Sequence, residues 1–162
     1  MIALVLAAAL GLQPLSVADP KLTPGVVRPI TIEQVCTTKW GKDHRAVTEG
    51  MKLQVFKRYG LSGNQDPRCT PDRNGRRCEV DHRISREIGG ADDILNLSPQ
   101  PYGGPWGASD KDRVENELHR RVCLPATDPA FMSLTAAQHA LSGDWTVLYR
   151  RWFGIPASAS GP

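Results

Sequence analysis

The stretch CEVDHRISREIGGADDILNLSPQ, residues 78–100, decides how this chain folds. Its first part, Cys78–Ile84, has the length of a β-strand. Gly89-Gly90 marks a turn, and Ile94–Leu97 is a second short strand candidate. Charged, amide and imidazole side chains are more densely placed here than elsewhere in the chain. We therefore expect a short two-stranded hairpin that carries the chemistry of the protein.

Helical patterns surround the expected hairpin on both sides. Apolar side chains recur every four residues between Asp43 and Tyr59, and Gly60 ends that pattern. Capping residues mark the starts of other helices. The expected helices are a short one capped by Thr31, Asp43–Tyr59, one from Ser109 to Val122, and one from Ser133 or Thr135 to Trp152. Helices around two short strands indicate an α+β fold.

Both ends of the chain differ in composition from its middle. The apolar run Ile2–Leu12 is shorter than the ~20 residues that span a bilayer, and it resembles the core of a secretory signal. Small side chains at Ser16 and Ala18 predict cleavage before Asp19. We expect a signal peptide at 1–18, a proline-rich extended leader at 19–30, one domain at 31–156 and a loose tail at 157–162. The protein would then be exported; in the alternative interpretation it works inside the cell and its apolar start is misassigned.

The composition excludes several classes of protein. With 40% hydrophobic and 23% charged residues, the chain is neither collagen-like, nor a coiled coil, nor wholly disordered. Its length of 162 residues suits a single domain with a real core. The formal net charge of +3 is mild, so it permits binding to nucleic acid but does not argue for it.

Four cysteines in an exported chain indicate two disulfides. Cys69 and Cys78 flank a turn, so a local bridge between them closes easily, and this leaves Cys36 to pair with Cys123. The longer bridge would stabilise the fold by ~4 kcal/mol through the entropy of the unfolded chain. The competing interpretation is a zinc site, which the lack of any C-x-x-C pair disfavours.

Asp81 and His82 are adjacent in the first expected strand, and Asn96 lies in the second. Hydrolysis of a phosphodiester needs a base that deprotonates water and a cation that stabilises charge on the phosphoryl oxygens. A neutral imidazole accepts a proton at neutral pH, and a carboxylate is a hard ligand for Mg²⁺ or Mn²⁺. Adjacent strand residues point to opposite faces, however. The two side chains can serve one phosphate only if the strand is irregular or the site lies at the edge of the hairpin.

The order of these residues resembles that of the HNH endonuclease family. The resemblance is carried by Asp81-His82-x-Ile84, Gly89-Gly90, Asn96-Leu97, Pro99-Gln100 and Lys111-Asp112-Arg113-Val114-Glu115. It is strongest toward small bacterial HNH-signature proteins, and it extends from about Thr31 to Trp152. Further positions of that branch are matched by Tyr59-Gly60, Val122-Cys123, Gln138 and Asp144-Trp145. The resemblance implies a ββα-metal finger, in which two strands and a helix follow one another.

The resemblance implies a metal-dependent endonuclease that cleaves DNA or RNA with weak sequence preference, DNA being the favoured substrate. Asp81 would bind one divalent ion, Mg²⁺ or Mn²⁺ with Zn²⁺ as the other option. His82 would be the general base, and Asn96 would complete the catalytic signature by bracing the loop. Arg83 and Lys111 would contact phosphates.

One signature position departs from the family. Relatives carry Asn or His ahead of the Lys-Asp pair as the second metal ligand, whereas Gly107 stands there in this chain. Ser109 or Asp110 could replace that ligand, and Asp110 offers the better oxygen donor. One alternative is a catalytically degenerate member that binds nucleic acid or a protein without cleavage. Another is an envelope protein in which the finger is only a scaffold.

Three further features are candidates for a supporting role. Glu79 shares the face of Asp81 on a regular strand. A basic run could follow the phosphates of a nucleic acid, or be a solvated loop. It comprises Arg73, Arg76, Arg77, Arg83 and Arg86, of which Arg86 is a further expected phosphate contact. Trp106, in a loop rich in glycine and proline, is a candidate for stacking on a base.

Overall fold

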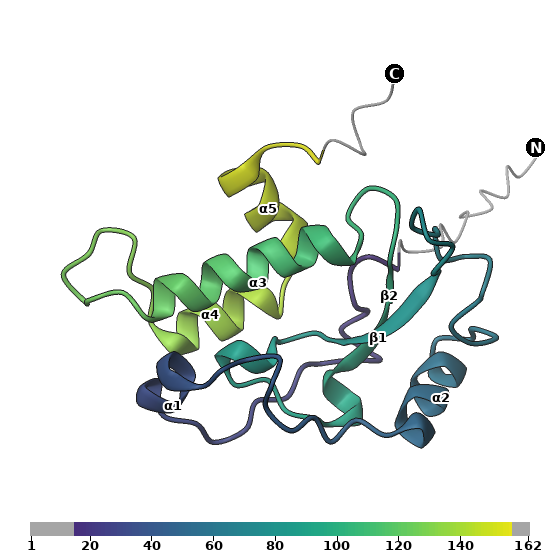
Figure 1. Ribbon diagram of the computed structural model, residues 1–162, viewed down its shortest axis with the longest axis horizontal. Helices are drawn as coiled ribbons and strands as arrows, with labels where there is room; N and C mark the ends of the chain where they lie inside the picture. The colour runs from purple at the N-terminus through teal and green to yellow at the C-terminus, as the bar shows by residue number, and fades with distance from the viewer. Residues whose placement is uncertain (1–14, 157–162) are drawn as a thin grey trace, which may run out of the picture.

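The structure is a computed structural model, and it describes residues 15–156 of the chain. Most of the expected signal peptide and the whole expected tail, 157–162, lie outside the described residues. Within residues 15–156 the chain forms five α-helices and one two-stranded antiparallel sheet (Figure 1). The elements are α1 (Ile32–Thr37), α2 (Glu49–Arg58), β1 (Cys78–His82), β2 (Leu97–Pro101), α3 (Ala108–Val122), α4 (Leu134–Leu141) and α5 (Trp145–Phe153). The expectation of a mixed α+β fold is confirmed.

β1 and β2 pair residue for residue, and His82 at the end of β1 lies opposite Leu97. The second strand thus begins where the expected one, Ile94–Leu97, ends. Residues 94–96 form a 3₁₀ turn instead, which the side chain of Asp93 caps. An aspartate that bonds the amide two residues further on favours a turn over an extended chain, and this explains the difference.

The molecule has two hydrophobic cores, with the sheet between the two groups of helices (Figure 1). In one core, α3 packs against α4 and α5 through side chains such as Val114, Leu118, Leu141 and Trp145. In the other, α2 packs on the sheet, with Phe56 buried between them. The hairpin therefore lies between α2 on one side and the core of α3, α4 and α5 on the other.

The helix expected at Asp43–Tyr59 is shorter in the structure. α2 begins only after Thr48, whose side chain caps it. The residues before Thr48 are bound elsewhere, because the Ala46 amide donates to Asp92 Oδ2 at 2.6 Å. Such contacts hold residues 43–47 against the loops that follow β1, and this long-range bonding outweighs the local periodicity.

Other helix boundaries were predicted with mixed success. α3 begins ahead of the expected cap Ser109, with Gly107 in the cap position and no side-chain cap. The last expected helix is two helices, because Asp144 caps a new one by binding the amide two residues further on. The expected starts at Thr31 and Ser133 are confirmed, since each side chain caps its helix.

Two disulfides, Cys36–Cys123 and Cys69–Cys78, join the cysteines in the expected pairs. The first links α1 to the end of α3, and the second ties the loop before β1 to that strand. Bridges of this kind persist in an oxidising, extracellular environment. Among the helices of residues 15–156, none is both long and apolar enough to cross a membrane.

Candidate active site

Asp81 and His82 stand at the end of β1, where both line one cavity of about 290 Å³. The His82 side chain is almost fully buried, at 5% exposed, whereas that of Asp81 keeps 24% of its surface. Adjacent residues of a regular strand would face opposite ways, but the strand ends at His82. The end of the hairpin is thus the place where both side chains reach one cavity.

The carboxylate of Asp92 holds the imidazole of His82 in place. Asp92 Oδ1 lies 2.7 Å from His82 Nε2, so Nε2 carries the proton of the neutral ring and Nδ1 is the basic nitrogen. Burial lowers the pKa of His82 below its usual value, although the charges of Asp81 and Asp92 oppose this shift. The ring is therefore neutral at neutral pH and able to accept a proton.

Asp92 is a site residue that sequence reasoning missed. Its Oδ2 accepts from the Ala46 amide, and the Nε of Arg86 lies 3.4 Å from its Oδ1. Burial raises the pKa of Asp92, but these donors together with His82 lower it below its usual value. The one signal for its role was an acidic residue in the segment between the strand that carries the imidazole and the turn that carries the amide.

Asn96 is fully buried and uses all of its hydrogen-bonding capacity on backbone. Its Oδ1 accepts from the amides of Ile84 at 3.0 Å and Val26 at 3.3 Å, and its Nδ2 donates to the carbonyls of Ile84 and Ala91, both at 3.0 Å. A Cβ on Gly90 would lie 1.7 Å from the Ile84 carbonyl oxygen, which explains the glycine at this turn. This bonding is what a bracing role requires, and it leaves Asn96 no part in the chemistry.

Lys111, expected to contact phosphates, lies instead inside the protein. Its residue is 4% exposed, and its ammonium donates to Asp81 Oδ2 at 2.5 Å, to the His82 carbonyl at 2.8 Å and to Glu115. Burial opposes its charge, but the two carboxylates raise the pKa of Lys111 above its usual value. Likewise Lys111 lowers the pKa of Asp81 against the effect of burial. The expectation of a phosphate contact is corrected: Lys111 is a fixed internal cation.

Arg83 and Arg86 are also held by the protein rather than left for phosphates. Arg83 is buried and donates to the carbonyls of Thr23 at 2.6 Å and Ser142 at 2.9 Å. Arg86 pairs with Asp43 and with Asp92. Arg83 therefore joins the leader to the α4–α5 turn, and Arg86 fixes residues 43–47 beside the cavity. Neither position supports the expected phosphate contact.

The expected pair of metal ligands is not brought together. The carboxylate of Asp110 accepts from the Trp106 amide at 3.1 Å and lies next to Tyr149, away from Asp81. A Cβ on Gly107 would lie 2.7 Å from the Tyr102 carbonyl oxygen, so the missing ligand has no room there either. In residues 15–156, no group of three His, Cys, Asp or Glu side chains is arranged to hold a metal ion. The donor set that the resemblance implies does not fit a divalent ion here.

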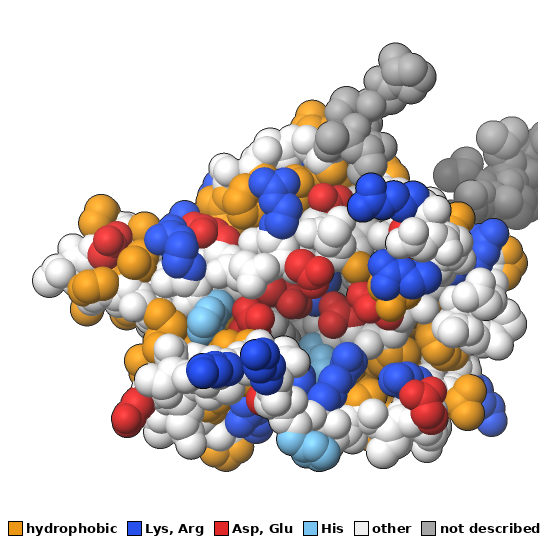
Figure 2. All heavy atoms as spheres, in the orientation of Figure 1, with side chains coloured by type: hydrophobic (Ala, Val, Ile, Leu, Met, Phe, Trp, Pro, Cys, Tyr) orange, Lys and Arg blue, Asp and Glu red, His pale blue; other side chains and the backbone are white. Residues whose placement is uncertain are grey.

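Acidic side chains surround the entrance to the site. Figure 2 shows them gathered about a hollow in the middle of one face, with basic side chains on its rim. Glu79, Asp81 and Asp112 line a cavity of about 680 Å³, next to the one that His82 lines. Burial and the charge of Asp81 raise the pKa of Glu79 to about 7, and burial raises that of Glu115 to about 8. Protonation of one of these carboxyl groups relieves their mutual repulsion.

Arg45 is a second residue that sequence reasoning missed. Its Nη2 donates to the Val80 carbonyl at 2.9 Å, and its exposed side chain lines both cavities described above. The predicted helix Asp43–Tyr59 includes Arg45 and gave no reason to connect this residue with β1. Thr48 was the signal that could have found it, because a helix that starts at this cap leaves Arg45 in a loop.

Trp106 does not project into the site as the stacking role required. Its ring makes edge contacts with Trp145 at 6.1 Å and Tyr149 at 5.6 Å between centroids, and Arg150 lies over it. The loop folds back so that the ring joins the core of α3, α4 and α5. The expectation of base stacking at Trp106 is therefore corrected.

Comparison of the chain with protein-family models, with curated proteins and with solved structures found no match. The chain's own residues place a neutral, oriented His82, an internal cation at Lys111 and an exposed Arg45 around one acidic hollow.

Proposed function

We propose that this protein hydrolyses phosphodiester bonds of nucleic acid at the cavity that Asp81 and His82 share. The observation that carries the proposal is the His82 imidazole, buried, neutral and held through Nε2 by Asp92. A base prepared in this way, at the end of a hairpin that a helix follows, is the arrangement expected of an HNH-like ββα finger. The two disulfides agree with the export that the expected signal peptide implies.

In the proposed reaction, His82 Nδ1 takes a proton from water, and the hydroxide attacks the phosphorus atom. The bond to the leaving oxygen breaks, and that oxygen receives a proton from His82 or from solvent. Asp92 stabilises the imidazolium that forms, and its second bond to Ala46 keeps it oriented. Arg45, with its exposed guanidinium beside the cavity, supplies positive charge to the phosphoryl oxygens. No step is routed through a divalent ion, because the expected ligands do not fit one.

The test is cleavage of plasmid DNA and of total RNA by the oxidised full chain, with Mg²⁺, Mn²⁺, Zn²⁺ or a chelator. We expect His82→Ala to lower the rate by about 10²–10⁴-fold, the usual contribution of a general base. His139→Ala, an exposed histidine on α4, is the matched control and should cleave as the unsubstituted protein does. Cleavage that survives in His82→Ala would overturn the proposed mechanism. Cleavage that requires a metal would overturn the metal-free reaction proposed here.

A binding function without cleavage is the second candidate. The observation that favours it is the bond from Lys111 to Asp81 Oδ2, together with the lack of space for a side chain at Gly107. A protein that has lost its metal ligands in this way would retain a surface for nucleic acid but not the reaction. No cleavage by folded, oxidised protein under any of the metal conditions, with binding retained, would select this function.

A further inference from the structure

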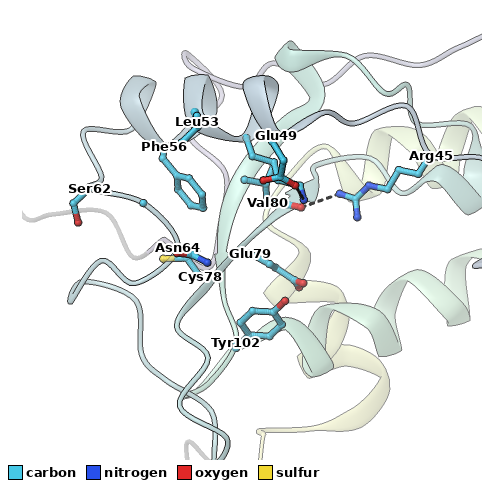
Figure 3. Close-up of a pocket in the computed structure, with 12 residues that line it drawn as sticks. Arg45, Glu49, Leu53, Phe56, Ser62, Asn64, Cys78, Glu79, Val80 and Tyr102 are labelled. Carbon is cyan, nitrogen blue, oxygen red and sulfur yellow. Dashed lines mark hydrogen bonds and ion pairs between the residues drawn. The ribbon is translucent and has the colours of Figure 1, made fainter.

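A third cavity, of about 430 Å³, lies between α2 and the start of β1 (Figure 3). We call it the α2 pocket. Figure 3 shows Leu53 and Phe56 entering it from α2, with the ring of Tyr102 on the opposite side. Asn64 and Ser62 lie at its far end. Its volume is within the range of sites for small organic groups, and its lining combines apolar and aromatic side chains with charged and amide ones.

The α2 pocket continues into the proposed active site. Arg45, Glu79 and Tyr102 line both this pocket and the cavity of about 680 Å³ beside Asp81. Arg45 and Asp81 in turn line the cavity that contains His82. The three cavities thus adjoin one another along β1, with Arg45 beside all three, and we call them together the groove. A groove of connected compartments suits a linear polymer better than a single small molecule.

The chemistry of the α2 pocket suits a nucleobase. Leu53 is 67% exposed although it is large and apolar, and Tyr102 presents an aromatic ring over which Arg76 lies at 4.2 Å. A planar base gains stacking and apolar contact between such walls, and its edge groups can bond an amide such as that of Asn64. The phosphate that follows the base would meet Arg45, where the pocket joins the site.

We propose that the α2 pocket takes an unpaired nucleobase of the strand whose phosphodiester is cleaved at His82, so that the substrate is single-stranded DNA or RNA. This inference rests on the proposed function and specifies its substrate. A paired, stacked base cannot enter a side pocket unless it leaves the duplex, which costs a few kcal/mol. Duplex nucleic acid is therefore excluded from this mode of binding.

The test measures binding and cleavage separately. Binding of fluorescein-labelled oligonucleotides to full-length His82→Ala protein is followed by anisotropy, for one sequence as single-stranded DNA, as single-stranded RNA and as duplex. We expect single-stranded DNA and single-stranded RNA each to bind at least about tenfold more tightly than the duplex. An oligonucleotide that lacks all its bases should lose this advantage.

Two substitutions locate the effect in the pocket. Leu53→Ser and Tyr102→Leu, each made in the His82→Ala protein, should weaken binding of the single strand by at least about fivefold, the lower end of base-stacking effects. Val147→Ser, an exposed apolar residue on α5 outside the groove, is the matched control and should have no effect. Circular dichroism shows whether each variant is folded, and because Leu53 is exposed its substitution leaves the core intact.

The outcomes separate the two proposals. Equal affinity for duplex and single strand, or unchanged affinity in both pocket variants, overturns the inference. Binding of neither form also overturns it. The proposed function depends instead on cleavage by the unsubstituted protein, which is assayed on the same oligonucleotides. Binding to single strands that requires Leu53, without any cleavage, would support the pocket and overturn the hydrolase.

Discussion

The two ends of the groove use their polar side chains in opposite ways. Around His82 the charged groups are bonded to one another: Lys111 to Asp81, and Asp92 to both the imidazole and a backbone amide. Around the α2 pocket several polar side chains are exposed, as those of Arg45 and Asn64 are, although Arg45 also donates to the Val80 carbonyl. The first end is buried and bonded before any ligand arrives, and the second keeps exposed side chains that a ligand can contact. This difference predicts that substitutions of the buried residues change stability or chemistry, and that those of the exposed residues at the second end change affinity and rate but not stability.

Lys111→Met should have the largest effect. Removing the ammonium leaves Asp81 and Glu115 close together without a counter-charge, and breaking such a buried network costs about 3–5 kcal/mol of unfolding free energy. Urea denaturation at neutral pH measures this, with Lys57→Met, an exposed lysine on α2, as the control. An unchanged urea midpoint for Lys111→Met would show that the Lys111 ammonium does not stabilise the end of the groove around His82.

Asp92→Asn should lower cleavage by about 10²-fold or more while the protein stays folded. Both carboxylate oxygens accept hydrogen bonds, one from His82 and one from the Ala46 amide. The asparagine side chain must turn its NH₂ group toward one of these two donors. If it faces His82, the ring proton moves to the other nitrogen; if it faces Ala46, residues 43–47 are displaced. Single-turnover cleavage measures the loss. Rates equal to those of the unsubstituted protein would remove Asp92 from the mechanism.

Arg45→Ala should lower the cleavage rate without changing stability, because the side chain is exposed and lines all three cavities. We expect about a tenfold loss of cleavage rate, corresponding to one charge-assisted hydrogen bond, with no change in the thermal midpoint. Lys42→Ala is the control, because this exposed lysine is close in sequence and lines none of the three cavities. A large fall in the thermal midpoint for Arg45→Ala would erase the distinction between the two ends.

The smallest effect is expected from the pH dependence of stability at Glu79. Burial raises its folded-state pKa to about 7, above the unfolded value, so the folded protein binds the proton more tightly. Its contribution to stability is present below the unfolded pKa and is lost as pH rises through about 7. Glu79→Gln should therefore reduce the fall of the thermal midpoint between pH 5 and pH 8 by a few degrees. The same decline in both proteins would contradict this assignment.

Local chemistry explains what the sequence predicted well. The disulfide pairs, the caps at Thr31 and Ser133 and the strand that carries Asp81 depend on neighbours in sequence or on simple counting. The misplaced features depend on distant partners. Residues 43–47 leave their expected helix because Asp92 and Arg86 bind them across more than forty positions.

The direction in which side chains point was the other feature that the sequence did not predict. Lys111 carries the same charge as any surface lysine. Glu115 lies four positions further along the same helix, but only the approach of β1 to α3 brings Asp81 to the ammonium. Asp110 sits one position before it on the helix and consequently faces another way, toward Trp106. A family pattern gives the order of such residues, but the rotation of one helix decides which of them reach the site.

The disulfide Cys36–Cys123 closes a covalent ring of chain that contains every residue lining the groove. β1, β2, the start of α3 and the α2 pocket all lie between its two cysteines, which are 87 positions apart. A protease that cuts once inside this ring leaves two pieces that remain joined. The exposed loop before β1 is spanned a second time by Cys69–Cys78. A chain nicked there keeps both walls of its groove together, an advantage in the oxidising, extracellular environment that the two disulfides suggest.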